Sequence, residues 1–208
     1  MQINLTSLGK RFNRDWIFRN LNYQFDFNKH YAITGPNGSG KSTLLQIISG
    51  SAIYNEGSVN YYEQNNSIAP ENIFQKISFA APYLELVEEM TLNEFFSFHN
   101  KMKGWLPSID TKQIVYLLRL EKSAYKQIRY FSSGMKQRVK LAQAIFSDVP
   151  TVLLDEPLTN LDDDGILLYH SLIKNYCSNR LVIVSSNDKK EYSFCDEIIN
   201  IMDYKLSN

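Results

Sequence analysis

Nine consecutive residues in the first quarter of the chain have the composition of a phosphate-binding loop. Residues 35–43 are Gly-Pro-Asn-Gly-Ser-Gly-Lys-Ser-Thr, which fits the pattern G-x-x-x-x-G-K-[ST]. The glycines let the backbone curl so that successive N–H groups point at anionic oxygens. Lys41 can reach the outer phosphates, and Ser42 can ligate magnesium. We therefore predict a nucleoside-triphosphate site whose contacts come from Gly35, Pro36, Asn37, Gly38, Ser39, Gly40, Lys41, Ser42 and Thr43.

Two adjacent carboxylates follow a strongly apolar segment later in the chain. Residues 151–154 predict a buried strand, and it ends at Asp155 and Glu156. Ligands of α/β sheets bind at the carboxyl ends of the strands, where these two side chains would lie. We expect Asp155 to join Ser42 in holding magnesium. We expect Glu156 to polarise a water for attack on the terminal phosphate.

Two further stretches could contact a nucleotide. In the segment 131–138, Ser132 is a favourable helix N-cap, and Gly134 would leave backbone N–H groups exposed at the start of a cationic helix. Taken alone, such a stretch is more often a simple capped helix. Phe12 stands in a basic loop upstream of the phosphate loop, where it could stack on an adenine ring. Trp16 is the rival candidate, and ordinary packing is the alternative for both.

The elements around the phosphate loop follow the order strand, loop, helix. Residues 31–34 predict a short buried strand, and residues 43–50 predict a helix closed by Gly50. Upstream, apolar and polar residues alternate from Leu21 to Phe27, which indicates a half-buried strand within an antiparallel region over residues 1–30. We thus predict an α/β fold with an N-terminal antiparallel β-subdomain.

The pattern becomes helical after about residue 84. Thr91 to Glu94 forms a capping box, and Asp110 can cap a second helix. We interpret residues 84–146 as an α-helical subdomain inserted into a single domain that spans residues 1–208. Before it, residues 56–61 and 77–80 predict strands, whereas Gln64 to Asn72 predicts a polar loop.

Composition excludes several classes of protein. The chain has 22 basic and 22 acidic residues, so bulk electrostatics give no reason to expect a nucleic-acid partner. Its two cysteines fit no metal spacing and no disulfide framework, which favours a reducing, cytoplasmic location. The sequence shows no signal peptide and no apolar run of membrane-spanning length. We therefore expect any membrane association to come through a partner.

The order and spacing of these motifs resemble those of ATP-binding cassette (ABC) ATPases. The resemblance includes the phosphate loop, the 132–138 stretch, Asp155 with Glu156, and Leu161 with Asp162, and it covers nearly the whole chain. It implies a P-loop NTPase fold, ATP and Mg²⁺ as cofactors, and the role of ATP-binding subunit in an ABC transporter. A GTPase would need a base-reading Asn-Lys-x-Asp motif, which this sequence lacks.

The resemblance also implies partners. Family members dimerise head to tail, so each ATP lies between one subunit's phosphate loop and the signature stretch of the other. On this view Ser132 and Gly134 contact the γ-phosphate held by the opposite chain. The residue that stacks on adenine is Phe12 rather than Trp16. The second subunit could be identical or different. A transmembrane permease would hold the pair on the inner face of the cell membrane, with no nucleic acid involved.

Three positions depart from the family pattern. The signature is Phe-Ser-Ser-Gly-Met, where the family usually has Leu-Ser-Gly-Gly-Gln. Pro82 stands where the family has a glutamine that touches magnesium and the attacking water, and proline offers no side-chain acceptor. Asn187 stands at the position of the switch histidine; it can donate a hydrogen bond to the γ-phosphate but cannot become cationic. We assign Asn187, with Glu156, to the catalytic set.

These features lead to ranked hypotheses about function. The first is an ATPase that powers a transport complex and hydrolyses ATP slowly, because Glu156 is retained. The second is a hydrolysis-deficient regulatory or structural ATP-binding module, or the degenerate half of a heterodimeric pair, as Pro82 and Asn187 would favour. A soluble ABC protein that acts on DNA or ribosomes ranks last, because such proteins usually carry tandem cassettes or long coiled-coil insertions.

Overall fold

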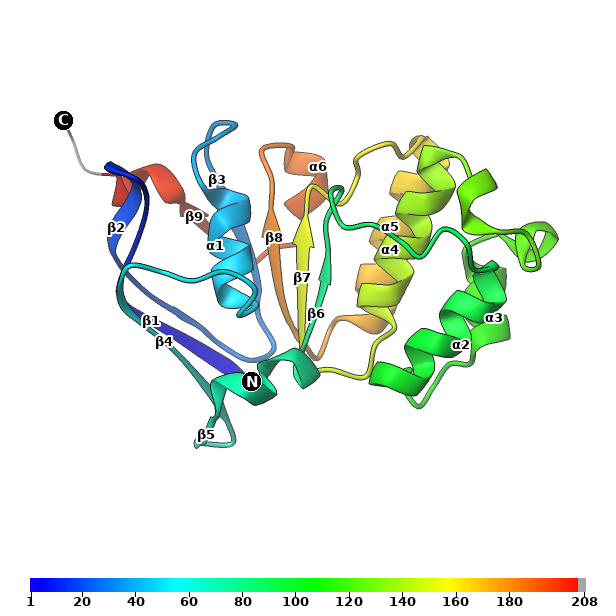
Figure 1. Cartoon of the computed structure of the whole chain (residues 1–208), viewed down its shortest axis with the longest axis horizontal. Coiled ribbons are helices and arrows are strands. Elements are labelled where there is room, and N and C mark those ends of the chain that lie inside the picture. The colour runs from blue at the N-terminus through cyan, green and yellow to red at the C-terminus, as the bar shows by residue number, and fades with distance from the viewer. Residues whose placement is uncertain (206–208) are drawn as a thin grey trace.

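The computed structural model describes residues 1–205, which form two β-sheets with helices between and beside them (Figure 1). The antiparallel sheet has the strand order β2-β1-β4-β5 and contains β1 (Gln2–Phe12), β2 (Asp15–Phe25), β4 (Glu56–Glu63) and β5 (Asn66–Ile68). The parallel sheet has the order β6-β7-β8-β3-β9 and contains β3 (His30–Thr34), β6 (Ile77–Ala80), β7 (Thr151–Asp155), β8 (Leu181–Ser185) and β9 (Glu197–Asn200). The predicted fold class is confirmed.

The helices other than α1 begin after a capping side chain, whereas α1 begins after Gly40. They are α1 (Lys41–Ile48), α2 (Leu92–Lys103), α3 (Thr111–Leu117), α4 (Ser133–Ile145), α5 (Asp163–Tyr176) and α6 (Lys189–Tyr192). Thr91 and Glu94 form the predicted capping box of α2, since the Thr91 hydroxyl accepts from the Glu94 backbone N–H and the Glu94 carboxylate accepts from that of Thr91. Asp110 caps α3 in the same way with Gln113. Within residues 1–205, no helix is long and apolar enough to cross a membrane.

The central strands β7 and β8 of the parallel sheet are buried on both faces, as their continuous apolar runs predict, whereas the edge strand β9 is partly exposed. Val152 and Leu154 point to one face and pack into a core with the helices of residues 92–177. Leu153 points to the other face and packs with α1 and the antiparallel sheet. Figure 1 shows the result, with α1 on one side of the parallel sheet and α4 and α5 on the other. The sheet is therefore the wall that the two cores share.

The far end of α4 is anchored by a buried arginine. Arg180 is only 6% exposed, and its guanidinium donates to the backbone carbonyls of Ile145, Ser147 and Val149. A cation at a helix C-terminus is favourable because the last carbonyls lack intrahelical partners. Burial lowers the pKa of Arg180 but leaves it cationic at neutral pH. The start of β8 and the end of α4 are thereby joined.

Two local predictions were wrong. Gln64 to Asn72 is not a loop, because Gln64 and Asn65 make a tight turn between β4 and β5, and a 3₁₀ turn follows at Pro70–Gln75. Both turn residues have positive φ, 49° and 67°, which is the geometry of a two-residue hairpin turn. Phe12 is the last residue of β1 rather than part of a loop. A short exposed strand of polar residues has the same composition as a loop, so composition alone does not distinguish the two.

Candidate functional site

The phosphate loop follows β3 and depends on glycine at two places. Gly40 ends the loop as the N-cap of α1 with φ 106°, a left-handed conformation that favours glycine. A Cβ atom at Gly40 would lie 2.2 Å from Cγ2 of Ile17 in β2. Gly38 also has a positive φ, but space there is open. The loop thus packs tightly on the antiparallel sheet at its base and is open at its tip.

Lys41 begins the helix that follows the loop. Its side chain is buried, and Nζ donates to the carbonyl oxygens of Gly35 at 2.8 Å and Pro36 at 3.2 Å. The ammonium therefore lies across the loop, next to the N-terminal end of α1. Both the cation and the free N–H groups of the helix terminus favour an anion at this place.

Beside the loop is a cavity of about 340 Å³ that brings together most of the predicted nucleotide contacts. Its walls are formed by Phe12, Ile17, Asn37, Gly38, Gly40, Lys41, Ser42, Thr43 and Glu156. Phe12 is 54% exposed, and the Lys10 ammonium lies 4.8 Å from its ring centroid. Trp16 is instead covered by the Arg19 guanidinium, 4.5 Å from its ring, and does not line this cavity. Phe12 is the aromatic that faces the phosphate loop.

The two predicted carboxylates follow β7, but their environments differ. Asp155 is 2% exposed, and its Oδ1 finds no hydrogen-bond partner among residues 1–205. Glu156 is exposed and has φ 42°, a left-handed conformation that is strained for this residue. Its backbone N–H donates to the Ser185 carbonyl at 2.9 Å, which fixes the turn. The Glu156 side chain reaches the cavity wall, whereas that of Asp155 is enclosed.

These residues fit a magnesium ion. An orphaned carboxylate oxygen at Asp155 and the hydroxyl of Ser42 are hard oxygen donors of the kind that Mg²⁺ prefers. Across residues 1–205 there is no cluster of three or more histidine, cysteine or acidic side chains suited to holding a metal. Magnesium suits such a sparse donor set, because it is usually bound by one or two carboxylates together with water and substrate phosphates.

Asn187 contacts the phosphate loop directly, which the sequence did not predict. Its Oδ1 accepts a hydrogen bond from the Gly35 backbone N–H at 3.2 Å, and its Nδ2 donates to Asn37 Oδ1 at 3.0 Å. Asn187 follows β8, the neighbour of β3 in the sheet, so both strand ends meet at one edge. The family resemblance placed Asn187 near the γ-phosphate, but its hydrogen bonds to the loop itself depend on the strand order, which the spacing of the motifs does not give.

The predicted signature residues lie apart from this cavity. Ser132 caps α4 by accepting a hydrogen bond from the Met135 N–H at 3.2 Å, as predicted. Neither Ser132 nor Gly134 lines the cavity beside the phosphate loop. Figure 1 shows the N-terminal ends of α1 and α4 at the same edge of the molecule, on opposite sides of the parallel sheet. One chain therefore presents two separate helix N-termini, the kind of place where backbone N–H groups favour an anion.

Tyr83 and Gln46 are polar neighbours of the site that sequence reasoning missed. Tyr83 lies in a turn after β6, which the Leu84 N–H closes on the Ala81 carbonyl at 3.2 Å. Its hydroxyl accepts from Gln46 Nε2 of α1 at 3.2 Å. Burial, followed by the negative charge of Asp155, raises the pKa of Tyr83 to about 12. Sequence reasoning could have found Tyr83 from its position just after the carboxyl end of a predicted strand, because α/β sheets bind ligands at that end.

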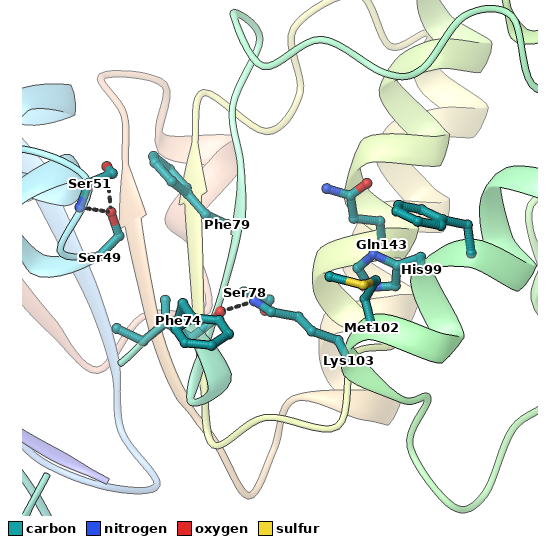
Figure 2. A pocket seen from close by; sticks show the side chains of 11 residues that line it. Ser49, Ser51, Phe74, Ser78, Phe79, His99, Met102, Lys103 and Gln143 are labelled. Atoms are coloured by element: carbon teal, nitrogen blue, oxygen red, sulfur yellow. Dashed lines mark hydrogen bonds between the residues drawn. The ribbon is translucent and has the colours of Figure 1, made fainter. Parts of the chain in front are cut away.

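A second, more apolar groove of about 420 Å³ lies away from the phosphate loop (Figure 2). It runs between the end of α1 and β6 on one side and α2 on the other, and its labelled walls include Ser49, Phe74, Phe79, His99, Met102 and Lys103. The Lys103 ammonium donates to the Ile77 carbonyl, and burial lowers its pKa. His99 stacks on Trp105 with ring centroids 4.7 Å apart.

Solved structures share this fold. A putative ABC transporter ATP-binding protein from Pyrococcus furiosus superposes with a TM-score of 0.82 at 20% identity, covering 99% of this chain and 100% of that one. The ATP-binding cassette MJ0796, solved as a dimer in a post-hydrolysis state bound to ADP and Pi, also has a TM-score of 0.82, at 23% identity, with 99% and 97% covered. At these identities the likeness shows the fold.

Sequence relatives extend the comparison to the family. An uncharacterized ABC transporter ATP-binding protein of Bacillus subtilis, YybJ, is 31% identical over 93% of this chain and 89% of its own length. The cytochrome c biogenesis ATP-binding export protein CcmA of Xylella fastidiosa is 31% identical over 74% of this chain and 68% of its own length. The ABC transporter family model matches residues 18–159. The chain therefore belongs to the ABC transporter family, as one of its ATP-binding proteins.

Proposed function

We propose that this chain is the ATP-binding and ATP-hydrolysing subunit of an ABC transporter and that it dimerises around ATP to drive a membrane partner. The observation that supports this best is the cavity of about 340 Å³, because Phe12, Lys41, Ser42 and Glu156 all line it. An adenine ring, a polyphosphate and an attacking water need these different side chains within one space.

Each wall of the cavity suits one part of the nucleotide. Phe12 stacks on the adenine, and the loop amides with Lys41 bind the phosphates. Ser42 and Asp155 hold magnesium, which when bound neutralises phosphate charge. Glu156 accepts a proton from the attacking water, and its strained backbone directs the carboxylate toward the loop. Asn187 would have to exchange its hydrogen bonds with Gly35 and Asn37 for one to the γ-phosphate.

A dimer follows from the separation of the two helix ends. Ser132 and Gly134 lie at the start of α4, across the parallel sheet from the phosphate loop of the same chain. A head-to-tail partner brings its own Ser132 end to the open tip of this loop, where Gly38 leaves space. The two chains then enclose ATP between them. The second subunit can be another copy of this chain or a different ATP-binding subunit, since both satisfy this geometry.

The membrane partner binds the apolar groove shown in Figure 2. The groove lies partly within residues 82–107, where we expect a segment of the permease to dock. Binding there holds the chain at the inner face of the membrane. Because α1 carries the phosphate loop at one end and Ser49 of the groove just beyond its other end, one short helix connects nucleotide and permease.

We infer slow hydrolysis. Pro82 replaces a glutamine side chain of the family pattern, and Asn187 replaces a histidine, so no imidazole can carry positive charge at that position. Retention of Glu156 keeps the chemical step possible. The second candidate, an ATP-binding module that hydrolyses almost nothing, is favoured by the same two residues and by the bonds that tie Asn187 to the loop.

The deciding experiment is ATP turnover by the purified protein with magnesium, measured over a range of protein concentrations. Turnover per chain that rises steeply with concentration is the expected result, because two chains are needed for each site. ATP affinity is measured separately by calorimetry. Tight binding with no turnover at any concentration would contradict the ATPase and support the regulatory module or half of a heterodimer.

Asn187→His separates a slow ATPase from an inert site. If the site is catalytically competent but slow, an imidazole next to the γ-phosphate should raise turnover by about 10-fold or more, as expected for a positioned acid–base group. A variant that binds ATP normally but hydrolyses no faster would favour the inert module.

A further inference from the structure

Glu156 is the first residue of a tight turn whose central peptide group lies inside the protein. The Thr159 N–H donates to the Glu156 carbonyl at 3.2 Å, which closes a four-residue turn over residues 156–159. The central peptide group joins Pro157 to Leu158, and both of these residues are buried. The closing bond uses neither the carbonyl nor the N–H of this peptide group, so both of them need other partners.

Two buried side chains supply those partners. Nε2 of Gln137 in α4 donates to the Pro157 carbonyl at 2.8 Å, and Oε1 of Glu191 in α6 accepts from the Leu158 N–H at 2.7 Å. Gln137 is 3% exposed and Glu191 is 5% exposed. Because the carbonyl and the N–H of a trans peptide point in opposite directions, the two side chains hold one group from opposite sides. We call Gln137 and Glu191 the peptide clamp.

The peptide clamp favours one orientation of the turn. Type I and type II turns differ in the orientation of the central peptide, and type II requires a positive φ at the third residue. That residue is Leu158, and it does not have a positive φ. Reversing the peptide would turn its carbonyl toward the Glu191 carboxylate, which cannot donate a hydrogen bond when ionised. The clamp therefore opposes reversal of the peptide.

The turn carries the strained backbone of Glu156. Its φ of 42° is a conformation that persists only where surrounding contacts hold it. The Glu156 N–H donates to the Ser185 carbonyl, and its own carbonyl accepts from Thr159. Glu156 and Glu191 also line one cavity of about 300 Å³, together with Asn187. The clamp thus acts on the same turn from which the Glu156 side chain projects.

Glu191 is itself held in place. The Tyr169 hydroxyl of α5 donates to the Glu191 backbone carbonyl at 2.8 Å in a buried position. Burial is the largest cause of a raised pKa at Glu191. A buried carboxylate is costly unless it accepts strong hydrogen bonds, and the bond from Leu158 is of this kind. The acceptor is therefore fixed at both its backbone and its side chain.

We propose that Gln137 and Glu191 are positioning residues that hold Glu156 in the orientation needed for hydrolysis, an inference that rests on the proposed function. They act through the peptide group between Pro157 and Leu158. Proline fixes φ at position 157, so the orientation of this peptide is passed to Glu156 through few free rotations. A displacement of about 1 Å at a reacting group can cost about 100-fold in rate, so a small movement of the turn matters.

The test compares two substitutions at Glu191 in the full chain. Glu191→Met removes the acceptor and keeps the length of the side chain, whereas Glu191→Gln keeps an oxygen acceptor and removes the charge. We expect turnover at saturating ATP to fall about 10-fold in Glu191→Met and to stay near the natural value in Glu191→Gln. ATP affinity, measured by calorimetry, is expected to stay unchanged in both, because the phosphate loop is intact. Equal losses in the two variants would overturn the clamp and assign the effect to charge.

Gln137→Met tests the other side of the clamp. Turnover should fall in the same direction with ATP affinity unchanged, and normal turnover in this variant would overturn a clamp with two sides. Glu121→Met is the matched control, since Glu121 is exposed. Thermal unfolding shows whether each variant keeps its fold. If Glu191→Met does not fold, Glu191→Asp keeps the charge and shortens the reach to Leu158, and its normal turnover would equally overturn the proposal.

Hydrogen exchange at the Leu158 amide tests the clamp without hydrolysis. By nuclear magnetic resonance, exchange should be faster in Glu191→Met than in the natural protein and Glu191→Gln, and unchanged exchange would overturn the clamp. If the natural protein bound ATP without any turnover, the proposed ATPase would fall, and the catalytic purpose of the clamp with it. A natural protein that hydrolyses ATP, with variants that hydrolyse it equally well, would overturn the clamp alone.

Discussion

The Oδ1 atom of Asn187 accepts a hydrogen bond from the backbone N–H of Gly35 at 3.2 Å, so the end of β8 holds the start of the phosphate loop. Nδ2 of the same side chain continues to Asn37. The side chain that we assign to the γ-phosphate is thus already bonded to the loop that binds phosphate. Contact with the nucleotide and contact with the loop compete for one amide.

Asn187→Ala should loosen the loop without unfolding the protein. Both bonds are solvent-exposed, so we expect a cost of about 1 kcal/mol or less in the free energy of unfolding. Hydrogen exchange at residues 33–40 should be faster, as followed by mass spectrometry. Asn175→Ala, which removes an exposed amide from α5, is the control. Unchanged exchange over the loop would show that Asn187 does not restrain it.

Lys41→Met should weaken ATP binding. Nζ is the buried cation at the loop, and hydrogen bonds that involve a charged group contribute about 1.5–3 kcal/mol each, which predicts a 10- to 100-fold rise in Kd. Calorimetry measures this change. Lys174→Met on the exposed face of α5 should bind ATP normally. Normal affinity in Lys41→Met would exclude Lys41 from phosphate binding.

Glu156→Gln should stop hydrolysis and keep ATP binding. The amide preserves size and hydrogen bonding but cannot take the proton of the attacking water, so turnover should fall by about 100-fold or more. Phosphate release measures turnover, and calorimetry measures affinity. Glu121→Gln, an exposed carboxylate in the segment before α4, is the control. Undiminished turnover in Glu156→Gln would remove Glu156 from the mechanism.

His99 should make stability depend on pH. Burial, helped by the charge of Lys103 and opposed by a hydrogen bond with the Gln143 backbone, lowers the pKa of His99 from 6.5 to about 4. The unfolded chain takes up a proton below pH 6.5 that the folded chain refuses until about pH 4. The protein therefore loses stability as pH falls through this window.

His99→Gln should remove part of that dependence. After a discount for solvent screening, we expect the variant to lose about 1 kcal/mol less than the natural protein between pH 7 and pH 5. Urea unfolding at the two pH values measures this difference. His170→Gln controls for removal of a histidine elsewhere. Parallel pH profiles for His99→Gln and the natural protein would show that His99 is not the cause.

Arg180→Ala should be strongly destabilising. It removes the buried donor of the Ile145 and Val149 carbonyls and one of the two donors of the Ser147 carbonyl, which keeps the Val149 N–H, and we expect this to cost about 3–5 kcal/mol. Thermal and urea unfolding give the change. Arg119→Ala removes a surface arginine as the control, because its contact with Asp164 is well exposed. A small effect at Arg180 would mean that water replaces the guanidinium.

The sequence was sufficient for those parts of the site that lie within one short segment. The phosphate loop, the Asp155–Glu156 pair and the Ser132 cap each have a local physical reason, namely glycine, a strand end or a capping hydroxyl. Contacts between segments were missed, because strand order cannot be read from spacing. Asn187 meets Gly35 across 152 residues, and Tyr83 meets Gln46 across 37.

The same limit explains the errors in the fold. The sequence predicts a loop from Gln64 to Asn72, which contains the hairpin turn and β5, because this short strand is exposed and polar and lacks the alternation that marks a half-buried strand. The division of the chain at residues 84–146 stays a prediction.

The wall shared by the two cores has a consequence for cooperativity. Val152 and Leu154 are covered by the same core that contains residues of α2, α3 and α4, so the helical segment has no apolar interior of its own. Removing the helical segment would expose one apolar face of β7 to solvent, and the segment would not fold as an independent unit. We expect the chain to melt in a single transition, and a helical segment transplanted from a relative to work only when the residues facing β7 are transplanted with it.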